Sequence, residues 1–302
     1  MSAGAKTGPG RGEGAALVLG FPSYQLPARR LAQRAGLDYA DVAIHAFPDG
    51  ESLVCLPERV PRHVILCLSL DDPNRKLIDL ELAAATAMQL GAERLTLVAP
   101  YLCYMRQDVA FHPGEAISQR IIGTLLARHF DTLVTVDPHL HRTGELKDAV
   151  PVRRAVALSA APVMTARLQQ RTDHPLLIGP DAESAQWVSA IAMASGLEYG
   201  IASKERLGDR TVRVTLPELP VAGRPVVLVD DVASTGHSLA EAATQLRARG
   251  AASISVLVTH ALFVDDALAR LRAAGVGEIC STDSVPHPSN AMSLDALLAA
   301  AL

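Results

Sequence analysis

Aromatic residues and cysteines are scarce in this sequence. Only 4% of its residues are aromatic, which argues against a nucleic-acid surface built on base stacking. The four cysteines are scattered along the chain without paired spacing (Cys55, Cys67, Cys103 and Cys280). Scattered cysteines argue against both a disulfide framework and a zinc site, so we expect a protein of the reducing cytoplasm.

Long apolar runs and a surplus of one charge are missing too. No apolar run approaches the length of a membrane span, and the first residues lack the apolar core of a secretion signal. The 28 basic and 32 acidic side chains give a net charge of −4, which leaves no electrostatic footprint for nucleic acid. We therefore expect neither a membrane nor a nucleic acid as a partner.

Strand and helix patterns alternate along most of the chain. Its 302 residues, 49% of them hydrophobic, suffice for two domains with well-filled cores. Short apolar runs typical of buried parallel strands recur at 16–19, 64–68, 95–100, 132–136, 176–178, 225–229 and 254–259. The sequence thus predicts an α/β protein of two domains, 15–150 and 151–302, each with a central parallel sheet flanked by helices. Residues 1–14, rich in Gly and Ala, are expected to form a disordered tail.

The stretch 225–239 is the most informative part of the sequence. Its apolar strand is followed by Asp230 and Asp231, then by Ala233, Ser234, Thr235, Gly236, His237 and Ser238, and then by a helical pattern. A strand that turns into a helix through small and hydroxyl residues presents N–H groups and the positive end of a helix dipole to a phosphate. The two acids would repel that phosphate, so we expect them to bind sugar hydroxyls or a cation. The stretch predicts a sugar-phosphate site, with Asp capping of a helix as the structural alternative.

Polar clusters also follow other predicted strands. Arg106-Gln107-Asp108 follows the run at 95–100, Asp137 and His139 follow 132–136, and Asp181 follows 176–178. Because ligands bind at the carboxyl ends of strands in open α/β sheets, we expect these clusters to gather at one edge. Structural alternatives remain for each: a surface ion pair for Arg106 with Asp108, a core or capping role for His139, and a helix N-cap for Asp181.

Two further segments have a recognisable local pattern. Asp49-Gly50 lies between two apolar runs, which predicts a hairpin. The segment 203–210 contains Lys204 and Arg206 among other charges but no apolar periodicity. It is expected to be a mobile loop, and a solvated hairpin tip is the alternative.

Together these segments resemble the ribose-phosphate pyrophosphokinase family, also called phosphoribosyl pyrophosphate (PRPP) synthetases. The resemblance spans residues 17–290 and rests on Phe47-x-Asp49-Gly50-Glu51, Pro100-Tyr101-x-x-Tyr104-x-Arg106-Gln107-Asp108, Asp137-x-His139, Pro180-Asp181-Ala182, Lys204-Glu205-Arg206 and 230–238. Ser234, where many bacterial members have Asp, looks more like the archaeal-type branch. The resemblance implies two tandem phosphoribosyltransferase-type domains. It also implies transfer of the β,γ-diphosphoryl group of ATP to O1 of ribose 5-phosphate, which yields PRPP and AMP.

The resemblance also implies roles for individual residues. ATP would be bound by Arg106, Gln107 and Asp108, together with Phe47, Asp49 and Glu51 of a neighbouring subunit, so the protein would be a homo-oligomer. Mg²⁺ would be held by His139 and Asp181, with Asp137 behind His139 fixing its ring. Lys204 and Arg206 would be catalytic and would neutralise charge on the transferred group. Ribose 5-phosphate would be held by Asp230, Asp231, Ala233, Ser234, Thr235, Gly236, His237 and Ser238.

Departures from the family pattern occur at three places. They are His237 in the phosphate loop, Val109-Ala110-Phe111 where the family continues with basic residues, and Glu183-Ser184 in place of Gly-Gly. Two other classes of protein stay open. A phosphoribosyltransferase would use the same loop to bind PRPP with a nucleobase. A non-catalytic relative would keep the fold and bind an active paralogue, but it should lack the metal ligands or the Lys-Arg segment that this sequence retains.

Overall fold

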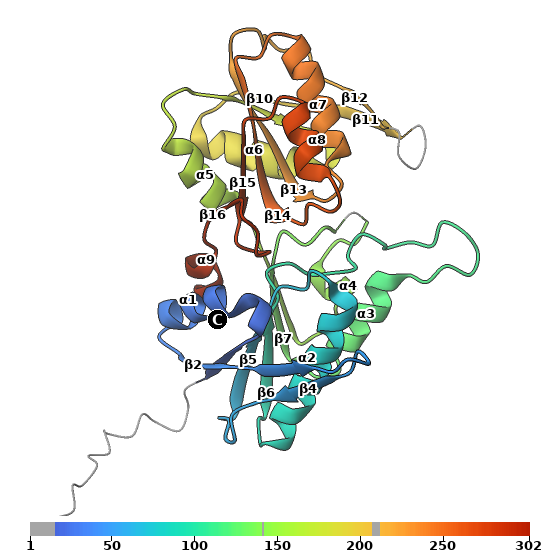
Figure 1. Ribbon diagram of the computed structural model, residues 1–302, viewed down its shortest axis with the longest axis vertical. Helices are drawn as coiled ribbons and strands as arrows, with labels where there is room; N and C mark the ends of the chain where they lie inside the picture. Colours follow the sequence, from blue (N-terminus) through green and yellow to red (C-terminus); the bar gives the residue numbers. More distant parts are fainter. Residues whose placement is uncertain (1–15, 141, 207–211) are drawn as a thin grey trace, which may run out of the picture.

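The computed structural model describes residues 16–140, 142–206 and 212–302. The chain forms two α/β halves placed end to end along the long axis (Figure 1). Each half is built on a six-stranded sheet. The tail expected at residues 1–14 lies outside the described residues. Within the described ranges, no helix is long and apolar enough to cross a membrane.

The first sheet has the strand order β2-β1-β5-β6-β7-β8, and all of its pairings are parallel. Its strands are β1 Leu17–Gly20, β2 Asp38–Asp41, β5 His63–Cys67, β6 Arg94–Val98, β7 Thr132–Val136 and β8 Arg154–Leu158. Its helices are α1 Gln25–Ala35, α2 Pro73–Gln89, α3 Ser118–Leu126 and α4 Leu146–Ala149. The central strands are buried along nearly their whole length, which is why they appear in the sequence as continuous apolar runs.

The boundary between the two sheets differs from the expected position near residue 150. Strand β8 pairs with β7 throughout, from Arg154 opposite Thr132 to Leu158 opposite Val136. The first sheet therefore extends to Leu158, and the second half of the chain begins after it. Residues 155–158 of this strand are all apolar, so the sequence did carry a short signal for it, although the strand is only partly buried.

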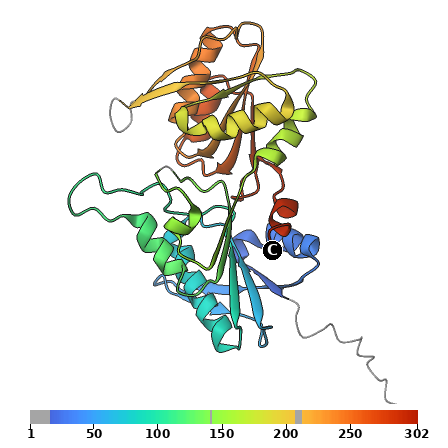
Figure 2. The same cartoon turned by 180° about the vertical axis from the view of Figure 1, so that it is seen from behind.

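The second sheet has the order β10-β9-β13-β14-β15-β16, again all parallel. Its strands are β9 Leu176–Gly179, β10 Tyr199–Ile201, β13 Pro225–Ala233, β14 Ser253–Ala261, β15 Glu278–Thr282 and β16 Asn290–Met292. Alternate residues of β13 belong to two hydrophobic clusters, because successive side chains of a strand point to opposite faces. One face is covered by α5 Ala161–Gln169 and α6 Ala185–Ser195, and the other by α7 His237–Ala248 and α8 Ala267–Ala273 (Figure 2). The predicted α/β architecture with a helix-flanked parallel sheet in each half is confirmed.

Two antiparallel hairpins stand apart from the sheets. The first pairs β3 Ala43–Ala46 with β4 Ser52–Cys55, as the Asp-Gly turn predicted. The second pairs β11 Ser203–Arg206 with β12 Val212–Thr215. The prediction of a loop over 203–210 is thus wrong for its first part, since Ser203–Arg206 is a paired strand. Residues 207–211 lie outside the described residues.

The end of the chain returns to the first half. Helix α9 Asp295–Ala299 lies beside α1 (Figure 1), and Arg34 of α1 forms an ion pair with Asp295 at 3.2 Å. Nearby, the Tyr24 hydroxyl donates to the carbonyl of Asp283 at 2.6 Å. The two halves are therefore joined by a second chain segment besides the connection after β8.

Helix α3 approaches the backbone of α4 closely enough to require glycine. A Cβ placed on Gly123 would lie 1.7 Å from the carbonyl oxygen of Ala149, whereas a Cβ on Gly144 would meet nothing nearer than Asp148 Oδ2 at 3.9 Å. We expect Gly123→Ala to destabilise the protein by about 1–3 kcal/mol, because overpacking forces backbone to move. Without this close approach, alanine in a helix would instead stabilise by up to about 1 kcal/mol. Urea unfolding decides the sign, with Gly144→Ala as the matched control.

Candidate functional site

The carboxyl ends of strands from both sheets meet at the junction between the halves (Figure 1). His139, just after β7, lies with its Nδ1 atom 2.6 Å from Oδ2 of Asp231, near the end of β13. These two residues are 92 positions apart in the chain. The predicted gathering of polar residues at one edge therefore involves both halves at once.

Asp231 is held as an anion by this contact. It is buried, and burial alone would raise the pKa of its carboxyl group. The hydrogen bond and charge of His139 outweigh that effect and bring the pKa of Asp231 below its ordinary value. Its other oxygen, Oδ1, accepts the backbone N–H of Val232 at 2.8 Å. Each carboxylate oxygen of Asp231 therefore accepts one hydrogen bond from within the protein.

Asp230 has the opposite electrostatic character. Loss of hydration, followed by the nearby charges of Asp231 and Asp181, raises its pKa well above the ordinary value. A carboxyl group in that setting gains from a hydroxyl donor or a cation, either of which would favour its ionised form. Of the two adjacent acids, Asp230 is the one better suited to bind a ligand.

Asp181, directly after β9, caps a short helical turn over Ala182–Ser184. Its Oδ1 atom accepts the N–H groups of Glu183 at 3.1 Å and Ser184 at 3.3 Å. The capping alternative from the sequence is therefore realised. Its influence on the pKa of Asp230 also places Asp181 at the same edge as the other acids.

His139 is the residue that the sequence analysis proposed as a ligand of Mg²⁺ together with Asp181. Asp231 accepts from the Nδ1 atom of His139, the kind of contact that orients an imidazole in carboxylate–histidine–metal sites. A carboxylate oxygen of Glu183 lies 3.7 Å from Nε2. No group of three or more His, Cys, Asp or Glu residues in the described ranges could hold a metal by itself. Mg²⁺ prefers oxygen ligands, keeps several waters and takes further oxygens from a substrate's phosphates, so the carboxylate of Asp181 fits it and a complete set of protein ligands is not needed.

The expected role of Asp137 as the partner that fixes His139 is not what the structure has. Its Oδ1 atom accepts from Trp187 Nε1 at 2.8 Å. Oδ2 accepts from Thr259 Oγ1 at 2.7 Å and from the N–H of Ala160 at 3.1 Å. Burial raises the pKa of Asp137 despite these three bonds. The orientation of the His139 ring is set by Asp231 instead, because the two lie within hydrogen-bond distance.

The predicted phosphate loop joins β13 to α7. The strand runs four residues further than expected, from Val229 to Ala233, so both acids belong to its end. Gly236 then takes a left-handed backbone with φ of 71°, which starts α7 and which glycine tolerates best. The carbonyl of Ser234 accepts the N–H of Val264 at 3.1 Å, so the segment that follows β14 holds the loop in place. Its hydroxyl groups precede the amino end of a twelve-residue helix.

Arg106 and its neighbours form the side of the junction that belongs to the first half. Arg106 is exposed and lines a small cavity of about 10 Å³ together with His139 and His260. Gln107 accepts from the Ser118 hydroxyl at 2.8 Å. Asp108 accepts from Arg142 Nη1 at 2.9 Å, and this pairing outweighs burial and lowers its pKa.

The remaining predicted residues are not part of this cluster. Phe47, Asp49 and Glu51 occupy the turn of the β3–β4 hairpin, which lies beside α2 and away from the junction (Figure 1). Phe47 is 41% exposed. The side chains of Lys204 and Arg206 lie outside what the structure describes, although their backbone belongs to β11.

Three residues of the junction were missed by the sequence analysis: Trp187, Thr259 and His260. Burial lowers the pKa of His260 to about 4, which keeps its ring neutral at neutral pH. Thr259 and His260 end the apolar run of β14, so the rule applied to other strands would have found them. Trp187 lies within a helix, and no sequence pattern indicated that it contacts Asp137.

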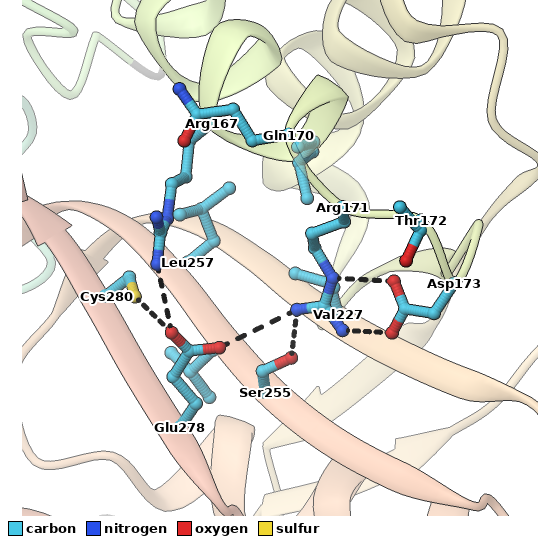
Figure 3. A pocket seen from close by; sticks show the side chains of 12 residues that line it. Arg167, Gln170, Arg171, Thr172, Asp173, Val227, Ser255, Leu257, Glu278 and Cys280 are labelled. Carbon is cyan, nitrogen blue, oxygen red and sulfur yellow. Dashed lines mark hydrogen bonds and ion pairs between the residues drawn. The ribbon is translucent and has the colours of Figure 1, made fainter.

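A second hollow, of about 380 Å³, lies toward the amino ends of β14 and β15, away from the carboxyl ends that form the junction (Figure 3). Arg171 forms a two-pronged contact with Asp173, at 2.9 and 2.6 Å. Arg167 reaches Glu278 at 3.2 Å. Because both arginines are already paired with carboxylates, this hollow offers no unmatched charge to a ligand, and we place the site at the junction.

Comparison with known proteins identifies the family. A family model described as the N-terminal domain of ribose phosphate pyrophosphokinase matches residues 17–129, and a phosphoribosyl synthetase-associated domain matches residues 215–299. The ribose-phosphate pyrophosphokinase of Methanopyrus kandleri is 36% identical over 270 residues, which cover 88% of this chain and 91% of the relative. Ribose-phosphate pyrophosphokinase 2 of Archaeoglobus fulgidus is 33% identical, over 93% and 98% of the two chains.

A solved structure shares the fold over nearly the whole chain. The crystal structure of phosphoribosylpyrophosphate synthetase from Mycobacterium smegmatis superposes with a TM-score of 0.81 at 22% identity, and covers 95% of this chain and 97% of the other. That likeness confirms the architecture of two phosphoribosyltransferase-type halves. With family models over both halves and archaeal relatives above 30% identity across most of its length, the chain belongs to the ribose-phosphate pyrophosphokinase family.

Proposed function

We propose that this chain is an active ribose-phosphate pyrophosphokinase of the cytoplasm, with its active site at the junction of the two halves. The O1 hydroxyl of ribose 5-phosphate attacks the β-phosphorus of ATP, the bond from that phosphorus to the bridging oxygen of AMP breaks, and PRPP and AMP are formed. The observation that carries this proposal is the contact between His139 and Asp231. It links the first half, on whose side we propose that ATP binds, to the sugar-phosphate loop of the second half.

Ribose 5-phosphate binds along the end of β13 and the start of α7. The loop Ser234–Ser238 offers hydroxyl and N–H donors to the 5-phosphate at a helix amino end. Asp230, whose carboxyl has a raised pKa, accepts hydrogen bonds from ribose hydroxyls and regains stability as an anion. Asp231 orients His139 through Oδ2, and the remaining lone pairs of its carboxylate accept from the ribose hydroxyls as well.

ATP lies across the side of the junction formed by Arg106, with its β,γ-phosphates toward His139. Mg²⁺, when bound at His139 and Asp181, neutralises charge on these phosphates. The chain's own residues then position the sugar hydroxyl in line with the β-phosphorus and exclude competing arrangements. Transfer of this kind depends on positioning and charge stabilisation more than on a strong base.

The proposal is tested by AMP release from purified protein. We expect AMP formation that requires ATP, ribose 5-phosphate and Mg²⁺ together, and no AMP when any one is left out. A phosphoribosyltransferase would instead consume PRPP with a nucleobase and release pyrophosphate. A non-catalytic relative would do neither, so each alternative has its own outcome.

His139→Ala supplies the matched inactive variant for that assay. The substitution removes the imidazole that faces the phosphates and leaves Asp231 without its partner, so we expect turnover to fall severely at saturating ATP. Circular dichroism checks that the fold survives. Near-wild-type turnover in this variant would contradict the assignment of the metal site.

Lys204 and Arg206 are proposed to neutralise the charge that develops on the transferring group. Each alanine substitution should lower kcat by about 10²–10³, the typical cost of losing one such donor. The KM values for ATP and ribose 5-phosphate should change much less, because the contact is strongest in the transition state. Glu205→Ala is the control, since a carboxylate at this position cannot stabilise a developing anion. Full kcat in both cationic variants would leave this segment with a structural role only.

A homo-oligomer is proposed because apolar side chains lie exposed on one side of the first half. Ile78 and Leu82, one helical turn apart on α2, are 59% and 40% exposed. Leu53 on the adjacent strand β4 is 50% exposed, and Phe47 follows β3 in the same hairpin. A patch of this kind marks a protein interface. Contact through it would bring Phe47, Asp49 and Glu51 to the nucleotide site of a neighbouring subunit.

Charge reversal within this patch tests the assembly. We expect Ile78→Glu to dissociate the oligomer and to lower activity, as followed by light scattering and AMP release at the same concentration. Met193→Glu, at an 81% exposed position on α6, is the control and should leave the assembly intact. A wild-type chain that is fully active as a monomer would contradict the shared nucleotide site.

A further inference from the structure

The turn after β7 is held from both sides of the junction. Asp137 has a left-handed backbone with φ of 38°, which Asp adopts more readily than most residues but less readily than glycine. This turn leads directly through Pro138 to His139. An unfavourable backbone of this kind persists only where the surroundings hold it in place.

Most of the hydrogen bonds that fix this turn come from the second half of the chain. Trp187 of α6 donates to one carboxylate oxygen of Asp137 at 2.8 Å, and Thr259 of β14 donates to the other at 2.7 Å. The ring of His260 lies 3.3 Å from the carbonyl oxygen of Asp137. Side chain and backbone of Asp137 are thus both bound by residues of the second half of the chain.

The carboxylate of Asp137 is 5% exposed, and Trp187 is 8% exposed. A buried carboxylate is costly unless its hydrogen bonds are complete, so these donors are not interchangeable with water. Removing one of them frees the turn to relax. Two residues later, the His139 ring has to meet Asp231 within 2.6 Å.

We propose that Trp187 is a positioning residue, which acts through Asp137 to place the imidazole of His139 against Asp231. The hydrogen bond from its indole transmits the position of α6 to the turn after β7. Thr259 does the same from β14. These hydrogen bonds fix the position of one half relative to the other at the junction. This inference rests on the proposed function, in which substrate phosphates and Mg²⁺ are bound at that place.

The test compares Trp187→Phe with Tyr24→Phe. Each variant loses one hydrogen-bond donor from a buried aromatic side chain, and each donor spans the two halves. The Tyr24 contact to Asp283 includes no residue of the proposed active site, so Tyr24→Phe controls for a loss of stability alone. Thermal unfolding should show a loss in both variants.

The direct measurement is the imidazole Nδ1–H proton of His139 in an NMR spectrum, assigned by its disappearance in His139→Gln. This signal reports the bond to Asp231 without substrate or turnover. In Trp187→Phe we expect it to broaden or vanish, kcat to fall by about 10–100-fold, and half-maximal activity to need more Mg²⁺. In Tyr24→Phe all three should match the wild type.

Preservation of the His139 signal and of kcat in Trp187→Phe would overturn the proposal and leave the indole a structural role only. Should that variant fail to fold, Thr259→Val and Thr259→Ser decide the matter. Serine keeps the hydroxyl and should behave like the wild type, whereas valine keeps the shape and should weaken the signal. Equal behaviour of the two would also overturn it. An inactive wild type that still shows the signal would contradict the pyrophosphokinase but not the link.

Discussion

A hydrogen bond between an imidazole and a carboxylate from opposite halves of the chain is the interaction on which the site depends. His139 and Asp231 each come from a strand end, and neither sheet alone contains both. The bond favours the ionised form of Asp231 although that residue is buried. Two otherwise ordinary parallel sheets thereby acquire a common edge with chemistry that neither has separately.

Most of the architecture could be predicted from the sequence because buried parallel strands leave continuous apolar runs. The runs at 64–68 and 132–136 correspond closely to β5 and β7. Strand β8 was missed although residues 155–158 form a short apolar run, and the three residues of β16 are too few to show a period. Because β8 was missed, the boundary between the sheets was placed before it instead of after it.

The site could be predicted only as far as each residue follows a strand. That rule located His139, Asp181 and Asp231, but it could not assign partners, because a contact such as that between Asp137 and Trp187 depends on how the halves meet. Asp137 lies two residues before His139, so the sequence suggested a local partnership that the turn of the backbone prevents. Side-chain direction after a strand end is decided by φ and ψ, which residue spacing does not reveal.

The return of α9 to the first half has a consequence for the order of folding. Leu298 of this helix belongs to the same hydrophobic cluster as Leu31 of α1. During synthesis, α9 leaves the ribosome after all the other described elements. The second sheet can therefore assemble while the first still lacks part of its apolar cover. Nascent chains would expose that uncovered surface of α1 for the whole time needed to make the second half, and during that interval it is open to chaperones.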